Sequence, residues 1–141
     1  MNRVSVLAEA LYYYRRNDAS FSHIYRADRY EKVRRFYVES KKLCEQLEYN
    51  DEVIHRLSKP YLGYTIACLK QECTLKRGYL ETYSAVKKIV DDDVLQSVLK
   101  ANKKDKSGIM RKVLFFSIRN RLYALCVLLL AGKQLISFRR K

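Results

Sequence analysis

The stretch IYRADRYEKVRRFYVESKKLCEQLEY, residues 24–49, decides the fold class of this chain. Its apolar side chains recur at steps of three and four residues, from Tyr30 through Val33 to Leu43 and Leu47. An α-helix has 3.6 residues per turn, so this spacing gathers the apolar side chains on one helical face. We therefore predict a helix of several turns that ends near Tyr49.

A second helical pattern follows directly. Asn50 or Asp51 is placed to cap its first turn, because a short polar side chain can accept a hydrogen bond from the unpaired backbone amides there. Pro60 should kink or break this helix, since proline removes a backbone donor. The apolar pattern resumes at Tyr61 and stops near Gly78.

Three further helical segments complete the pattern. We expect them at Tyr79 to Val90, at Val94 to Ala101, and from Ile109 to about Phe138 with a break near Asn120. Lys103 to Gly108 is a basic loop. The sequence predicts a mainly α protein, a compact bundle of about five or six helices, in which only the N-terminal segment has the composition of a strand.

The composition agrees with a single helical unit. The chain has 141 residues, of which 4 are Gly and 1 is Pro, too few for a turn-rich β-sandwich. The cysteines have no framework spacing and indicate reduced thiols and a cytoplasmic protein; they are Cys44, Cys68, Cys73 and Cys126. The longest uncharged run near the C-terminus, Leu122 to Gly132, is too short to span a bilayer.

The net charge of +14 comes mostly from the last third of the chain, because residues 103–141 alone carry a net +10. Such a field attracts anionic lipid headgroups or nucleic acid, although a basic surface can also serve only to keep a protein in solution. The cations that we expect to contact a membrane or another polyanion are Arg111, Lys112, Arg119, Arg121, Lys133, Arg139 and Arg140.

Apolar residues are interleaved with these cations, from Val113 to Leu130. A basic amphipathic helix of this kind can lie on the inner face of the cell membrane as a peripheral anchor. The same pattern fits a buried core helix with basic ends. The sequence leaves both interpretations open.

The acidic run Asp91-Asp92-Asp93 also has two interpretations. An Asp-x-Asp motif after an apolar strand can hold a divalent metal in nucleotide-sugar transferases. Here the preceding residues are helical in pattern, so we interpret the run as the cap and first turn of a helix. His23 and His55 have no ligand spacing, and we predict no metal site in this chain.

The N-terminal segment VSVLAEALYYYRRNDASFSH, residues 4–23, is compatible with a strand or a helix up to Tyr14. It resembles the end of the catalytic domain in family 2 glycosyltransferases of the GT-A fold, a bacterial family that joins nucleotide-sugar donors to polysaccharide or lipid-linked acceptors. In that family a strand ending in a Leu-Tyr-x-Tyr-Arg pattern is followed by a polar turn and a pair of small hydroxyl residues. Leu11 to Arg15 match the first pattern, and Ser20 and Ser22 match the pair.

The resemblance implies that residues 1–23 are the remnant of a catalytic domain and that residues 24–141 form its C-terminal helical domain. It also implies that five residues close the donor site, namely Tyr14, Arg15, Ser20, Ser22 and His23. The parent enzyme would use a divalent metal. The family's nucleotide-binding units and its catalytic base have no counterpart here, so this chain would need the missing catalytic domain as a partner and would not catalyse transfer alone.

A different class of function fits the same residues. The chain could be a standalone basic helical module that binds nucleic acid or a protein partner, or that forms a homodimer. Its clusters of tyrosine and arginine, such as Tyr12 to Arg16, could stack bases and hold phosphates. Tyrosine is also an ordinary packing residue between helices, and we favour that role, which makes nucleic acid the less favoured partner.

Overall fold

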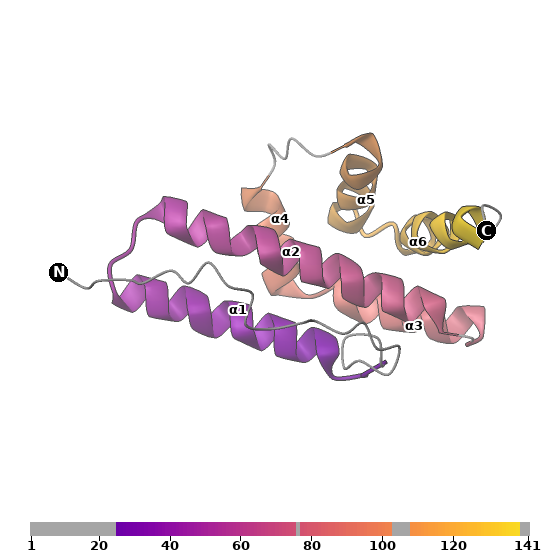
Figure 1. Cartoon of the computed structure of the whole chain (residues 1–141), viewed down its shortest axis with the longest axis horizontal. Coiled ribbons are helices and arrows are strands. Elements are labelled where there is room, and N and C mark those ends of the chain that lie inside the picture. The colour runs from indigo at the N-terminus through magenta and orange to yellow at the C-terminus, as the bar shows by residue number, and fades with distance from the viewer. Residues whose placement is uncertain (1–24, 76, 103–107, 139–141) are drawn as a thin grey trace, which may run out of the picture.

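The computed structural model of the chain describes residues 25–75, 77–102 and 108–138, with side chains as far as residue 132. This part contains six α-helices and no strand, which confirms the predicted mainly α bundle (Figure 1). The helices are α1 Arg29–Gln46, α2 Asp51–Thr74, α3 Tyr79–Val90, α4 Asp93–Ala101, α5 Ile109–Arg119 and α6 Tyr123–Phe138. The N-terminal segment that we assigned to a strand or a helix lies outside the described residues.

The helix boundaries follow local chemistry. The α2 helix begins at Asp51 as predicted, and the Asn50 side chain accepts a hydrogen bond of 3.2 Å from the amide of Val53. The α1 helix ends at Gln46, three residues before the predicted end, where Glu48 takes a left-handed backbone conformation. A left-handed residue cannot continue a right-handed helix, so the chain turns there.

Of the kink or break predicted at Pro60, the break is wrong, because α2 runs for 24 residues through this position. Proline removes one donor, which leaves the Arg56 carbonyl without its helical partner. Pro60 is exposed, so water can reach that carbonyl, while the neighbouring Tyr61 and Leu62 are buried in the core. Packing on the inner face therefore keeps the helix continuous. The helix ends at Thr74, short of the predicted Gly78.

The α2 helix is the centre of the bundle. The α1 helix lies along one side of it, and α3 and α6 pack against α2 as well (Figure 1). The α5 helix packs between α4 and α6. Its separation from α6 at Asn120–Leu122 confirms the predicted break, and Arg121 there has a positive φ of 55°.

The core lies where α2, α3, α4, α5 and α6 meet. Its fully buried members include Leu69, Val86, Val90, Leu95, Leu99, Ile118 and Cys126. Among the buried polar side chains is Gln96, which donates to the carbonyls of Val90 at 2.7 Å and of Ile118 at 3.0 Å. This amide satisfies carbonyls at the ends of α3 and α5, so it ties three helices together without leaving an unpaired buried group.

Candidate functional site

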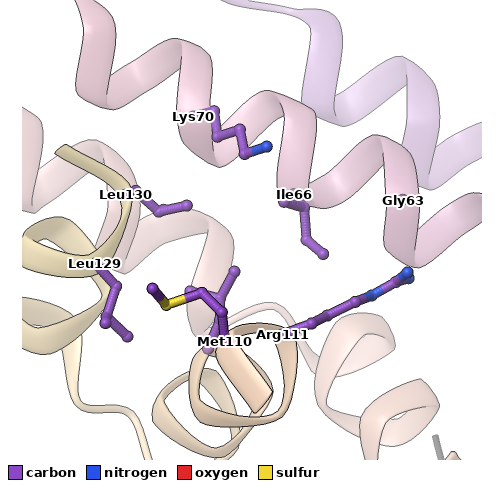
Figure 2. Close-up of a pocket in the computed structure, with 8 residues that line it drawn as sticks. Gly63, Ile66, Lys70, Met110, Arg111, Leu129 and Leu130 are labelled. Atoms are coloured by element: carbon purple, nitrogen blue, oxygen red, sulfur yellow. The ribbon is translucent and has the colours of Figure 1, made fainter. Parts of the chain in front are cut away.

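A hollow of about 260 Å³ opens between α2, α5 and α6 (Figure 2). Most of its lining is apolar, but two cations, Lys70 and Arg111, also border it. The residues that line it are Gly63, Ile66, Lys70, Met110, Arg111, Leu114, Leu129 and Leu130. None of these described residues is acidic. An apolar recess with a few polar groups at its border is typical of a ligand site, and this volume lies just below the usual range of about 300–1,000 Å³.

Helical spacing explains how α2 contributes to the hollow. Gly63, Ile66 and Lys70 follow one another at steps of three and four residues, so they lie on one face of α2. A Cβ atom added at Gly63 would meet no atom within 4 Å, which means that the border of the hollow is open at this point. The missing side chain at Gly63 therefore helps to leave the recess accessible.

The first turns of α5 supply the opposite wall. Figure 2 shows Met110 extending into the middle of the recess and Arg111 running along its border toward Gly63. The Arg111 guanidinium lies 5.2 Å from the centre of the Phe115 ring, a cation–π contact that holds this long side chain along the helix. Arg111 thus carries its positive charge to the border of the recess from a fixed position.

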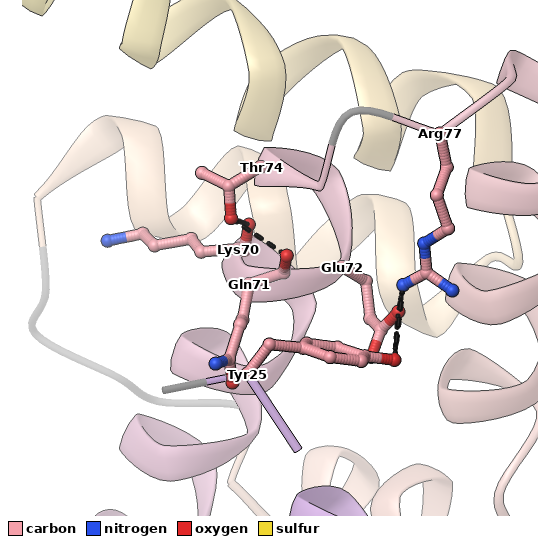
Figure 3. Close-up of polar contacts among 6 residues, drawn as sticks. All are labelled: Tyr25, Lys70, Gln71, Glu72, Thr74 and Arg77. Carbon is pink, nitrogen blue, oxygen red and sulfur yellow. Dashed lines mark hydrogen bonds and ion pairs between the residues drawn. The ribbon is translucent and has the colours of Figure 1, made fainter. Parts of the chain in front are cut away.

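Lys70 reaches the hollow from the other side of the opening (Figure 2). Two helical positions further along α2, Glu72 is buried in a separate cluster, where it accepts hydrogen bonds from Tyr25 and Arg77 (Figure 3). Figure 3 shows Lys70 pointing away from this carboxylate. The charge of Lys70 is therefore directed to the hollow and not neutralised by Glu72.

The α5 helix also has an unusual exposed face. Ile109, Val113 and Phe116 lie on it at helical spacing, and the side chains of Ile109 and Phe116 are 82% and 58% exposed. Lys112 is exposed beside them. The opposite face of the helix is buried through Leu114, Phe115 and Ile118. Both sides of α5 are thus apolar, and one of them is not covered by any described part of the chain.

The structure places the predicted cationic residues in different environments. On α5, Lys112 is exposed and Arg111 is half-buried. Arg119 instead donates to the Leu99 carbonyl at 3.1 Å, and Arg121 pairs with Asp91 at 3.6 Å. These two arginines hold α5 and α6 to the rest of the bundle. The side chain of Lys133 is not described, and Arg139 and Arg140 lie outside the described residues.

Lys70 was missed by the sequence interpretation. It lies 41 positions before Arg111, in a part of the chain whose charges nearly balance. No local motif marks it, and its role depends on how α2 packs against α5. The open position at Gly63 was missed for the same reason.

The acidic run has the structural role that we favoured. Asp92 is the N-cap of α4, where its carboxylate accepts from the amide of Leu95 at 3.0 Å. The same side chain pairs with Arg34 of α1 at 2.6 Å, and Asp91 accepts from the Tyr123 hydroxyl at 2.7 Å. In the described residues no group of three or more His, Cys, Asp or Glu is placed to hold a metal ion. The acidic run serves to join α1, α4 and α6.

Three tyrosines of α1 and α2 act as packing residues, whereas the cluster from Tyr12 to Arg16 lies outside the described residues. The rings of Tyr37 and Tyr61 stack with their centres 4.4 Å apart between α1 and α2, and the Tyr30 hydroxyl lies 3.3 Å from that of Tyr61. Burial raises the pKa of Tyr61 to about 12 and also raises the pKa of Tyr30. These rings stabilise the α1–α2 pair and are not available to stack on bases.

The buried cysteines are poor nucleophiles. Burial raises the pKa of Cys126 and of Cys73 to about 11 each and raises the pKa of Cys68, so the thiols stay protonated near neutral pH. All four cysteines are free. No thiolate chemistry is supported at these positions.

The residues assigned to donor-site closure, Tyr14, Arg15, Ser20, Ser22 and His23, lie outside the described part of the chain, so their arrangement stays a prediction. Within the described residues, no helix has both the length and the apolar character that crossing a membrane requires. Comparison of the chain with protein-family models, with curated proteins and with solved structures gives no match.

Proposed function

We propose that the described helices form a non-catalytic module that docks on an anionic membrane surface through the exposed face of α5. One observation carries this proposal: an apolar stripe of Ile109, Val113 and Phe116 lies open to solvent beside Lys112. After Asp93, the only acidic residue in the sequence is Asp105, whereas residues 103–141 carry 11 lysines and arginines. Such a face combines the two attractions that bind a peripheral helix to lipid.

The expected affinity is modest. Moving an apolar side chain fully out of water contributes about 1.5–3 kcal/mol, and a lysine close to an anionic surface contributes about 1 kcal/mol. Val113 and Phe116 are already partly covered by the bundle, so their contributions are smaller. The sum is several kcal/mol, which corresponds to reversible binding in the micromolar to millimolar range.

The character of this face favours lipid over nucleic acid. Non-specific nucleic-acid binding needs several cations that neutralise phosphates, often with exposed aromatic rings on which bases stack. The exposed face of α5 has one lysine among three apolar side chains, while Arg119 donates to the Leu99 carbonyl and Arg121 pairs at the surface with Asp91. The phosphates of a nucleic acid would find few cations to pair with on this face, whereas the acyl layer of a membrane would bury its apolar side chains.

The glycosyltransferase interpretation is compatible with this proposal but rests on residues 4–23 alone. In that case the α5 face would hold a parent enzyme at the inner membrane leaflet, where lipid-linked acceptors are found. The donor-closing residues and the missing catalytic domain remain predictions of the resemblance.

Vesicle sedimentation tests the docking face. We expect the protein to pellet with vesicles that contain phosphatidylglycerol and to remain unbound with pure phosphatidylcholine. Phe116→Asp should abolish pelleting, because it places a charge in the apolar stripe. Phe36→Asp is the matched control, since Phe36 is an even more exposed phenylalanine (74%) on α1, and it should leave binding intact. Circular dichroism checks that both variants remain helical.

Four results would contradict the proposal. Equal binding to neutral vesicles would show that charge plays no part, and undiminished binding by Phe116→Asp would show that α5 is not the contact. Failure to bind vesicles together with salt-sensitive binding to RNA would favour a nucleic-acid module. A stable dimer in sedimentation velocity that Phe116→Asp dissociates would assign the stripe to self-association instead.

A further inference from the structure

The α1 helix carries an apolar stripe that does not face the core. Phe36, Leu43 and Leu47 lie on one side of the helix, with Ser40 between the first two, because they follow one another at steps of four, three and four residues. The three large side chains are 74%, 55% and 57% exposed. Tyr37, which packs α1 on α2, is buried on a different side. We call Phe36, Leu43 and Leu47 the α1 stripe.

The place of α1 in the fold leaves this stripe open. The helix packs along α2 and lies at one edge of the bundle (Figure 1). Single exposed apolar residues are ordinary on a protein surface, but an apolar row with steps of four and three residues is the pattern by which two helices pack along a seam. The α1 stripe therefore has the form of a surface that another helix covers.

The charges along α1 are divided between its two ends. Residues 29–35 contain four arginines and lysines and one glutamate, a net charge of +3. Residues 45–52, at the other end, contain four acidic residues and no cation, a net charge of −4. Arg35 in the basic end and Glu48 in the acidic end are exposed. Cations near the start of a helix and anions near its end oppose the helix dipole, so this distribution does not serve the stability of α1 itself.

The stripe and the charges together fit a second copy of the chain in the antiparallel orientation. This orientation sets the basic end of each copy against the acidic end of the other, and two-fold symmetry makes the attraction occur twice. It also sets Phe36 of each copy opposite Leu47 of the other, and the small Ser40 opposite Leu43. A parallel pair would instead bring like charges together at both ends.

An anionic membrane is a poorer occupant of this face. Glu39, Glu45 and Glu48 are exposed along the length of the stripe, and anionic headgroups would repel them. The exposed face of α5, in contrast, has no acidic residue. The two apolar faces of the molecule therefore suit different partners.

We propose that two copies of the chain associate through the α1 stripe as an antiparallel, two-fold symmetric helix pair. Three large apolar side chains from each copy form a small interface beside the roughly 1,600 Å² of a standard stable complex, so the dimer is reversible, with a dissociation constant in the micromolar range. Figure 1 shows α5 on the other side of α2 from α1, so the pair leaves the proposed membrane face open. This inference does not rest on membrane docking.

Sedimentation velocity of the full chain over roughly a hundredfold range of micromolar concentrations tests the association. We expect the sedimentation coefficient to rise from that of a monomer to that of a dimer. Leu43→Asp should weaken the dimer at least tenfold, because it places a charge in the middle of the stripe. Leu80→Asp is the matched control, since Leu80 is a more exposed leucine (80%) on α3, and it should leave the dimer intact. A monomer at every concentration, or equal effects of the two substitutions, would overturn the proposal.

Charge reversal tests the orientation. Lys32→Glu combined with Arg35→Glu makes both ends of α1 acidic, and Glu45→Lys combined with Glu48→Lys removes the acidic end. Both changes suit the helix dipole, so α1 should remain folded. Arg34 is left unchanged because it pairs with the N-cap residue of α4. Each double variant should weaken an antiparallel dimer about fivefold or more. Tighter association of either variant would indicate a parallel pair and overturn the proposal.

Thermal unfolding distinguishes a dimer interface from a surface that the same chain covers. At a concentration where the protein is monomeric, Leu43→Asp should change the Tm by no more than about 2 °C, as expected for a substitution at an exposed position. A larger fall in the Tm of the monomer would show that another segment of the same chain covers the stripe, and would overturn the proposal.

Failure of the dimer and failure of membrane docking are distinguishable. Phe116→Asp should lose vesicle binding and keep the dimer. Phe36→Asp and Leu43→Asp should weaken the dimer and keep vesicle binding, when the vesicle assay is run at concentrations where the protein is monomeric. A dimer that Phe116→Asp dissociates and Leu43→Asp does not would place self-association on α5 and overturn the proposal.

Discussion

Gly63 is a residue whose missing side chain, and not its backbone conformation, matters in this chain. It lies in the interior of α2, where glycine is an unfavourable choice, because its backbone loses more freedom on folding than that of any other residue. Its backbone has no positive φ that would require glycine. What the missing side chain provides is open space at the border of the hollow.

Gly63→Ala should therefore stabilise the fold by about 0.5–1 kcal/mol, the difference between the two residues within a helix. The added methyl group meets no atom within 4 Å, so no clash offsets this gain. Urea unfolding followed by circular dichroism measures the effect. A loss of stability would show that the open space at Gly63 is occupied in the folded protein.

At the scale of elements, short polar contacts fix how the helices meet. Asp92 is the N-cap of α4 and also forms an ion pair with Arg34 of α1. Asp91 accepts a hydrogen bond from the hydroxyl of Tyr123 at the start of α6. A single acidic run thus orients three helices that are distant in sequence. Substitutions of Asp92 can remove either its charge alone or both its charge and its capping oxygen, so the two contributions to stability can be measured separately.

Asp92→Ala should destabilise the protein by about 2 kcal/mol, of which about 1 kcal/mol is the lost cap and the rest the charged hydrogen bond with the half-exposed Arg34. Asp92→Asn keeps an acceptor for the cap and should cost less, about 1 kcal/mol. Asp93→Ala, at an exposed position in the same turn, is the control and should cost a few tenths of a kcal/mol. Guanidinium unfolding measures all three, and equal costs for Asp92→Ala and Asp93→Ala would contradict the capping role.

At the scale of the whole molecule, the buried phenols and thiols make stability depend on alkaline pH. Burial raises the pKa of Cys73 and Cys126 to about 11 and that of Tyr61 to about 12, so these groups remain protonated in the folded state after they ionise in the unfolded chain. Above their unfolded values of 9 for cysteine and 10 for tyrosine, the unfolded state binds fewer protons than the folded state. Stability must then fall as pH rises.

We expect the free energy of unfolding to decline from about pH 9 as the cysteines ionise in the unfolded chain, and more steeply between pH 10 and 12 as the contribution of Tyr61 is lost. Urea titrations at each pH measure the slope. Tyr61→Phe should reduce the slope between pH 10 and 12, because it removes one of the responsible groups. Tyr64→Phe, on the same helix but exposed, should not change it. Identical slopes in the two variants would show that Tyr61 does not contribute.

The sequence by itself determined the helices, because apolar spacing, capping residues and the scarcity of glycine and proline act over only a few neighbouring residues. The start of α2 at Asp51, the cap at Asp92 and the break near Asn120 all follow from such local chemistry. The predicted break at Pro60 failed because it considered only local chemistry. Burial of Tyr61 and Leu62 by other helices outweighs the local cost of proline.

Only the tertiary structure decided where the candidate site lies. The sequence directed attention to the C-terminal cations, yet Arg119 donates to the Leu99 carbonyl and Arg121 pairs at the surface with Asp91, while Lys70 of α2 and Arg111 of α5 both border the hollow. Periodicity defines which residues share a helical face, but it does not define which faces of different helices meet. The division of the hollow into an apolar interior and a cationic border arises from that meeting, since its eight residues come from three separate helices.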